Sequence, residues 1–160
     1  MAKEKLNIPI AKTDFIKEDF QAQLKPLESG WIVQGPCVKE FEERWSSFTG
    51  AEISIATTSC TSALHMSLVA LDLKENDEVI VPAFTWISSA NVVEHIKAKV
   101  VFCDIDLKTF NIDSKKIESL ISAKTKAIIP VHLFGLSADM DPILKIAKKY
   151  NLFIVEDAAC

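Results

Sequence analysis

Three stretches of this chain place side chains that could bind a ligand or take part in a reaction directly after an apolar run. Asp157 follows one run, Trp86 follows another, and residues 57–63 read Thr-Thr-Ser-Cys-Thr-Ser-Ala after a third. An aspartate supplies a fixed charge, a tryptophan supplies a flat surface, and clustered hydroxyl groups supply hydrogen-bond donors. Each also has a structural alternative, because Asp, Ser and Thr cap helices and Trp packs in cores. Their meaning depends on the elements that position them.

The hydroxyl-rich segment links a predicted strand over 53–56 to a predicted helix over 61–71. Free N–H groups and the positive end of the helix dipole would favour an anion there, and Ser59, Thr61 and Ser62 add donors. Phosphate is the natural occupant of such a site, and N-capping by Ser59 or Thr61 is the alternative. The segment matches neither the Walker phosphate loop nor the Gly-x-Gly-x-x-Gly dinucleotide fingerprint.

The elements that carry these residues alternate after Gly50. The pattern predicts strands at 53–56, 78–81, 99–103, 126–131 and 152–155, and helices at 61–71, 88–95, 114–121 (capped by Asp113) and 140–150. Because the strands are uniformly apolar and separated by helices, we expect an α/β fold with a mostly parallel sheet and helices on both faces.

The first 50 residues read differently, as a helical segment that packs on the large domain formed by residues 51–160. Apolar residues at helical spacing predict one helix over 15–27, with Thr13 as its N-cap and Gly30 beyond its end. A second helix begins at Pro36 and stops at Gly50. We expect the apolar side chains of both helices to serve packing.

In a parallel sheet the carboxyl ends of the strands share one edge, so the three groups should converge. A phosphate cup, a stacking aromatic ring and a carboxylate together describe pyridoxal 5′-phosphate (PLP), a flat phosphorylated nitrogen heterocycle. An ionised Asp157 would keep the ring nitrogen protonated, and the protonated ring would draw electrons from the substrate. His132 also follows a strand, either as a ligand contact or, as we expect, in a structural role.

Six stretches of the chain, taken together, resemble the DegT/DnrJ/EryC1/StrS family of fold-type I PLP-dependent sugar aminotransferases. They are Gly30–Pro36 with Phe41 and Glu42, Ser59–Leu64, Asp77–Pro82 with Phe84–Trp86, Val101–Asp106, Thr125–Gly135 and Val155–Ala159. The resemblance implies a major domain of the PLP-transferase type, truncated at its C-terminus. It implies that Thr61 and Ser62 hold the phosphate, that Trp86 stacks on the ring, and that Asp157 pairs with the ring nitrogen. Ser59, Cys60 and Cys160 complete the cofactor-binding residues that the resemblance implies.

The same resemblance implies a homodimer that moves an amino group, typically from glutamate, to a nucleotide-linked keto-sugar. The family has Gly where this chain has Cys60, and commonly Gln, sometimes His, at the ring contact where this chain has Cys160. The Schiff-base lysine of the family comes beyond Cys160, so we nominate no catalytic residue and expect these 160 residues alone to be inactive. A sugar dehydratase and a non-catalytic binding or regulatory protein are the alternatives.

Composition narrows the class of protein. The 160 residues are 49% apolar and 25% charged, with a net charge of −4, which disfavours nucleic acid as a partner. No apolar run approaches the roughly 20 residues of a membrane span, and the N-terminus does not read as a signal peptide. The four Cys and three His residues lack metal-site spacing. We therefore expect a cytoplasmic protein without a metal, whose thiols are reduced and mostly buried.

Overall fold

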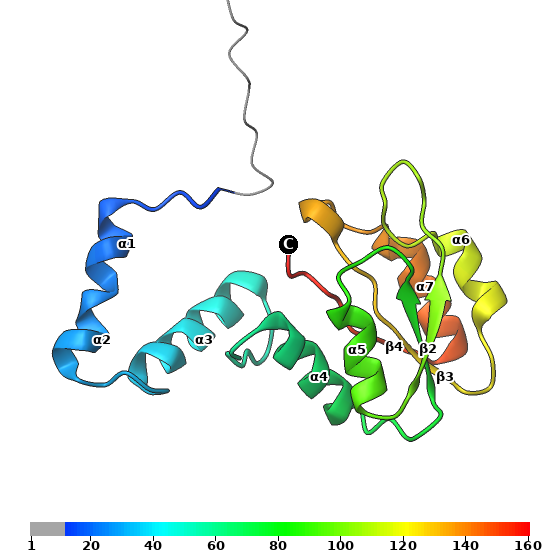
Figure 1. Ribbon diagram of the computed structural model, residues 1–160, viewed down its shortest axis with the longest axis horizontal. Coiled ribbons are helices and arrows are strands. Elements are labelled where there is room, and N and C mark those ends of the chain that lie inside the picture. The colour runs from blue at the N-terminus through cyan, green and yellow to red at the C-terminus, as the bar shows by residue number, and fades with distance from the viewer. Residues whose placement is uncertain (1–11) are drawn as a thin grey trace, which may run out of the picture. The chain divides into compact units, whose positions relative to one another are not determined.

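The computed structural model describes residues 12–160, which fall into two compact units with a boundary between Ala56 and Thr57. We call them the N-terminal unit and the α/β unit. The N-terminal unit contains α1 (Lys17–Ala22), α2 (Leu24–Ser29) and α3 (Pro36–Thr49) (Figure 1). In the part of the chain that the structure describes, no helix is both long and apolar enough to cross a membrane.

The single helix predicted over 15–27 is in fact the pair α1 and α2. Pro26 explains the break, because it has no N–H to donate to the carbonyl of Ala22 and its ring crowds that carbonyl. The N-cap is Ile16 and not Thr13, and the Ile16 N–H donates to Asp19 Oδ2 at 3.0 Å. Gly30 ends α2 in the left-handed conformation, as predicted.

Helix α3 has its predicted start at Pro36 and its predicted stop at Gly50, but the strand predicted over 53–56 does not form. Side chains of α3 hold that segment instead. Glu42 Oε1 accepts from the Ala56 N–H at 2.8 Å, and Ser46 Oγ lies 2.8 Å from Ser54 Oγ. A strand forms when its backbone groups hydrogen-bond to a neighbouring strand. Here a side chain of α3 accepts the Ala56 N–H instead.

The α/β unit contains ten elements. They are α4 (Cys60–Ala70), β1 (Glu78–Pro82), α5 (Ser88–His95), β2 (Lys99–Cys103), α6 (Ser114–Ile117), the 3₁₀ turn η1 (Glu118–Leu120), β3 (Thr125–Ile128), the 3₁₀ turn η2 (Leu133–Gly135), α7 (Met140–Tyr150) and β4 (Phe153–Ile154). The strands pair in parallel in the order β2-β1-β3-β4. The α/β fold with a parallel sheet is confirmed.

Helices cover both faces of this sheet, as the uniformly apolar strands predicted. On one face Val79 and Val81 of β1 pack with buried residues of α4 and α5. On the other face Ile80 packs with Ile117 of α6 and Ile143 of α7. Figure 1 shows α5 on one side of the strands and α6 and α7 on the other. The sheet is therefore packed between two layers of helices.

The N-terminal unit differs, because α1, α2 and α3 contain no buried residue. The expectation that their apolar side chains serve packing is therefore not met within this unit. Aromatic side chains contact one another in pairs along the helices, such as Phe41 with Trp45, whose ring centroids lie 6.1 Å apart. Phe48 nevertheless remains 83% exposed.

Candidate functional site

Asp157 is fixed by the backbone just beyond β4. Its N–H donates to the carbonyl of Pro130 at 2.9 Å, and its own carbonyl accepts from the His132 N–H at 3.0 Å. Asp157 thus forms a parallel bridge with Val131 past the end of β3, which extends the sheet by one step. The ladder presents the carboxylate at the carboxyl edge of the sheet, where open α/β folds bind ligands.

The Asp157 side chain is buried, with a relative exposure of 4%. Ser89 Oγ donates to Oδ2 at 2.7 Å, while the Ala159 N–H, at 3.2 Å, and Cys60 Sγ, at 3.6 Å, donate to Oδ1. Among residues 12–160, no Lys, Arg or His nitrogen lies within 4.0 Å of the carboxylate. A buried carboxylate with only neutral partners suits a cationic ligand, because burial without a countercharge is costly.

Helix α4 begins at the hydroxyl-rich segment, and both readings of that segment have a structural basis. Ser59 is the N-cap, and its Oγ accepts from the Ser62 N–H at 3.1 Å. The backbone N–H groups of Cys60 and Thr61 donate to no other described residue. Capping therefore leaves two N–H groups at the positive end of the helix, which is the arrangement that binds anions.

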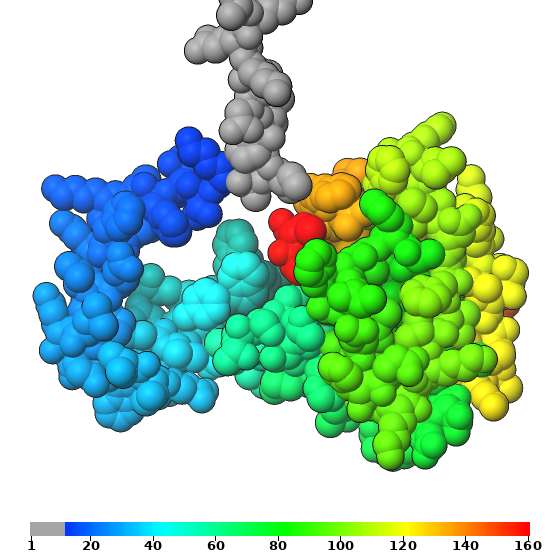
Figure 2. All heavy atoms as spheres, in the orientation of Figure 1, coloured from blue at the N-terminus to red at the C-terminus, as the bar shows by residue number. Residues whose placement is uncertain are grey.

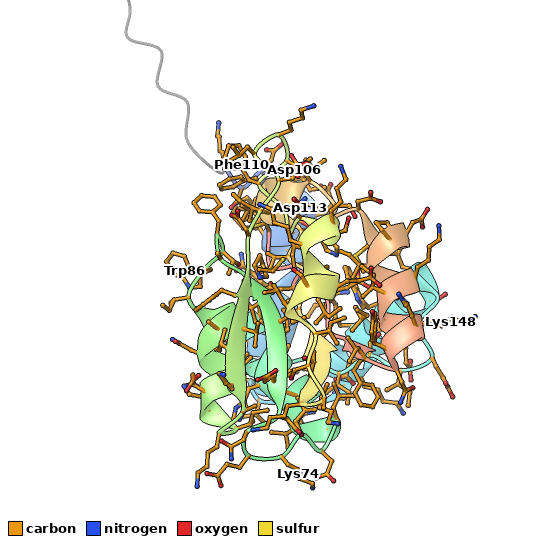
Figure 3. All side chains as sticks on the ribbon, turned by 90° about the vertical axis from the view of Figure 1, so that its right-hand side faces the viewer. Lys74, Trp86, Asp106, Phe110, Asp113 and Lys148 are labelled. Carbon is orange, nitrogen blue, oxygen red and sulfur yellow. The ribbon has the colours of Figure 1, made fainter. Side chains whose placement is uncertain are left out.

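Trp86 lies in the loop between β1 and α5 and is 76% exposed, so its side chain does not pack in the core of the described residues. Figure 3 shows its ring directed away from the ribbon, with Lys74 at the opposite end of the sheet. The Trp86 carbonyl accepts from the Ser89 N–H at 3.2 Å, which ties the loop to the start of α5. Stacking of Trp86 on a flat ligand stays a prediction.

Cys60 opens α4 with an ordinary helical backbone, since it is not among the residues with positive φ. A side chain is therefore tolerated where the resembling family has glycine. Burial raises the pKa of the Cys60 thiol, and the neighbouring Asp157 charge raises it further. Cys60 thus remains a protonated donor to the carboxylate. Cys160 is exposed, and its predicted contact with a cofactor ring stays untested.

His132 has the structural role that we expected. Its Nδ1 accepts from the Ala138 N–H at 3.1 Å, so Nε2 carries the proton and donates to Glu156 Oε2 at 2.8 Å. Its backbone N–H donates to the carbonyl of Asp157. Both ring nitrogens are satisfied within the protein, and the side chain fixes the segment that carries Asp157.

Two serines at the start of α5 belong to the site and were not predicted from the sequence. Ser88 Oγ accepts from Thr61 Oγ1 at 2.9 Å, and the adjacent Ser89 donates to Asp157. Serines at the start of a helix read as capping residues, so their long-range contacts left no signal in the sequence. These bonds bring the segments that carry Thr61 and Asp157 to the start of α5, which follows the Trp86 loop, while the roles of all three residues toward a ligand stay predictions.

The space-filling view agrees with this network. The C-terminal residues (red) lie among atoms of the segments near residues 85 and 134 (green and orange) (Figure 2). The Ser89–Asp157 bond explains the proximity of the C-terminal residues to the segment near residue 85, and the Val131–Asp157 bridge explains their proximity to the segment near residue 134.

The cysteine thiols are less buried than expected, because only Cys103 is buried, while Cys37 and Cys160 are exposed.

Comparison with known proteins shows extensive similarity to one family. The profile of the DegT/DnrJ/EryC1/StrS aminotransferase family matches residues 13–160. The spore coat polysaccharide biosynthesis protein SpsC of Bacillus subtilis is 46% identical over 143 residues, which are 89% of this chain and 37% of SpsC. GDP-perosamine synthase of Caulobacter vibrioides is 46% identical over 137 residues, covering 85% of this chain and 37% of the synthase.

The fold is likewise similar to solved structures. Spr1654 of Streptococcus pneumoniae in its PMP form superposes with a TM-score of 0.87 at 36% identity, covering 96% of this chain and 43% of that one. The PLP form of the same protein gives the same values. The chain spans about 37% of the length of the curated relatives described above.

Proposed function

Because this chain belongs to the DegT/DnrJ/EryC1/StrS aminotransferase family, we propose that it forms the cofactor-binding part of a PLP-dependent sugar aminotransferase. GDP-perosamine synthase and SpsC, both similar to it, carry names tied to sugar chemistry. The proposed reaction transfers an amino group from an amino acid, with glutamate as the donor, to a nucleotide-linked keto-sugar. We also propose a cytoplasmic homodimer.

One observation carries the proposal: Asp157 is a buried carboxylate at the ligand edge of the sheet, and every described donor to it is neutral. A protonated pyridine nitrogen is the cation that such a carboxylate would balance. When bound, PLP supplies an electron sink for the carbon that loses or gains the amino group.

The remaining donors fit the same cofactor. The free N–H groups of Cys60 and Thr61 at the start of α4 suit its phosphate, and the exposed Trp86 suits its ring. Hydrogen bonds link α4 and Asp157 to α5, which follows the Trp86 loop. The chain therefore offers one group for each end of the cofactor and one for its face.

The test is a calorimetric titration of the full chain with pyridoxamine 5′-phosphate (PMP), which binds without a covalent bond. We expect saturable binding that Asp157→Asn weakens at least about tenfold, because the variant removes the charge opposite the ring nitrogen. Asp113→Asn, at the N-cap of α6, is the matched control and should leave the affinity unchanged.

Two results would contradict the proposal: no saturable binding of PMP, or equal effects of the two substitutions. Amino transfer itself is assayed by mass spectrometry of a nucleotide-linked keto-sugar incubated with the full-length protein, PLP and glutamate. Conversion to the amino-sugar supports the transferase. Loss of a hydroxyl group without gain of nitrogen would identify a dehydratase instead.

A further inference from the structure

Ser89 is the second residue of α5 and is completely buried. Its hydroxyl group donates to Asp157 Oδ2 at 2.7 Å and, among the described residues, is the sole donor to that oxygen. The other two donors, Cys60 and Ala159, both reach Oδ1. Removing the Ser89 hydroxyl would therefore leave Oδ2 without a protein partner.

A second hydroxyl group stands behind Ser89. Thr85 Oγ1 lies 3.1 Å from Ser89 Oγ. A serine hydroxyl has one proton to donate, and an ionised carboxylate can only accept. Because the Ser89 proton is committed to Asp157, Thr85 must be the donor to Ser89. The three side chains thus form a directed chain from Thr85 through Ser89 to Asp157, in which each bond polarises the next.

The neighbouring serine serves a different group. Ser88 Oγ accepts from Thr61 Oγ1 and so connects α5 to the start of α4, and it does not bond the carboxylate. Two adjacent hydroxyl groups on one helix therefore bond different groups of the site. This separation makes Ser88 a natural control for Ser89.

We propose that Ser89 is a positioning residue, which through the Thr85–Ser89–Asp157 chain holds the carboxylate oriented for pairing with a cationic ring nitrogen. Hydrogen bonds donated to a carboxylate favour its charged form, and a buried donor also restricts its rotamer. The inference deepens the proposed function and rests on it. Ser89 acts only through Asp157 and needs no contact with the ligand.

The test compares two ligands on the full chain by calorimetry. One is PMP, and the other is its 1-deaza analogue, in which carbon replaces the ring nitrogen and the ring itself cannot be protonated. Ser89→Ala should weaken PMP binding about tenfold and leave the affinity for the analogue unchanged, because a hydrogen bond to a charged group is lost. Ser88→Ala should change both affinities by the same factor.

A spectroscopic measurement gives an independent readout. With PMP labelled with ¹⁵N at the ring nitrogen, the chemical shift reports whether that nitrogen is protonated. In the wild type we expect a protonated ring nitrogen at neutral pH, and in Ser89→Ala the loss of that proton should move to lower pH. Ser88→Ala should reproduce the wild-type titration.

Thr85→Val extends the test to a partly exposed position, in case Ser89→Ala does not fold. It removes the donor behind Ser89 and should lower the ratio of PMP to analogue affinity by about two- to threefold, since the effect is indirect. A folded Ser89→Ala or Thr85→Val protein with an unchanged ratio would overturn the role of Ser89 while leaving the proposed function standing. Failure of the wild type to bind either ligand would overturn both.

Discussion

The N-terminal unit and the α/β unit use apolar side chains in opposite ways. In the α/β unit, residues of β1 such as Ile80 are fully buried beneath the helices that cover the sheet. In the N-terminal unit, α1 to α3 are equally helical but bury none of their residues. Apolar periodicity thus predicts a helix in either unit, whereas burial also requires a second surface, which here is the sheet.

The largest expected contrast between the units is in stability. Ile80→Ala removes a fully buried side chain and should cost about 2–5 kcal/mol of unfolding free energy, because it leaves a cavity beneath α6 and α7. Phe48→Ala removes a side chain that is 83% exposed and should change it by less than about 0.5 kcal/mol. Urea unfolding followed by circular dichroism measures both, and equal losses would contradict the contrast.

A second contrast concerns the thiols. Burial raises the pKa of Cys103, in β2, to about 11 from the ordinary 9.0. Since only the thiolate reacts with iodoacetamide, Cys103 at pH 8 should react about 100-fold more slowly than an ordinary thiol. The exposed Cys37 at the start of α3 should be labelled well before Cys103. Peptide mass spectrometry over a time course tests this order, and early labelling of Cys103 would be inconsistent with its burial.

The smallest contrast concerns acidic side chains. Ser122 Oγ donates to Glu78 Oε2, and this bond, with Lys99 nearby, lowers the pKa of Glu78 below its ordinary 4.5. Glu78→Gln should lower the free energy of unfolding by about 1 kcal/mol at pH 7. Since the folded-state pKa is lowered, this stability is present above the ordinary value and lost as pH falls through the folded value.

Glu40→Gln is the matched change in the N-terminal unit, because Glu40 pairs with Arg44 on the exposed face of α3. The substitution should lower the free energy of unfolding by no more than about 0.5 kcal/mol, as is typical of exposed ion pairs one helical turn apart. Urea unfolding at pH 7 and pH 3 separates the two cases. A loss for Glu78→Gln that persists undiminished at pH 3 would argue against an ionic origin.

The sequence predicted most of the α/β unit, because each of its elements has a strong local pattern. Helices α5 and α7 and strand β2 have the predicted bounds. The predicted strand over 53–56 was wrong because strand formation depends on a partner that local pattern does not reveal. The single helix over 15–27 was wrong because the periodicity outweighed the effect of Pro26 in the prediction.

The sequence predicted which segments form the candidate site but not the hydrogen bonds between them. Topology alone brings Asp157 and the residues after β1 to one edge of a parallel sheet, so their convergence followed from the strand order. The hydrogen bond from Ser89 to Asp157 joins residues 68 positions apart. It depends on how α5 is rotated about its own axis, which sets the direction of the Ser89 side chain. Such contacts follow from packing, which the sequence of one chain does not display.

A crystal structure of the full chain bound to PMP would test the role of Asp157 without intermediate steps. We expect the ring nitrogen within about 2.7–3.2 Å of the Asp157 carboxylate, and the phosphate at the N–H groups of Cys60 and Thr61. A complex in which the ring nitrogen contacts another group, with Asp157 still bonded only to its neutral donors, would contradict this expectation.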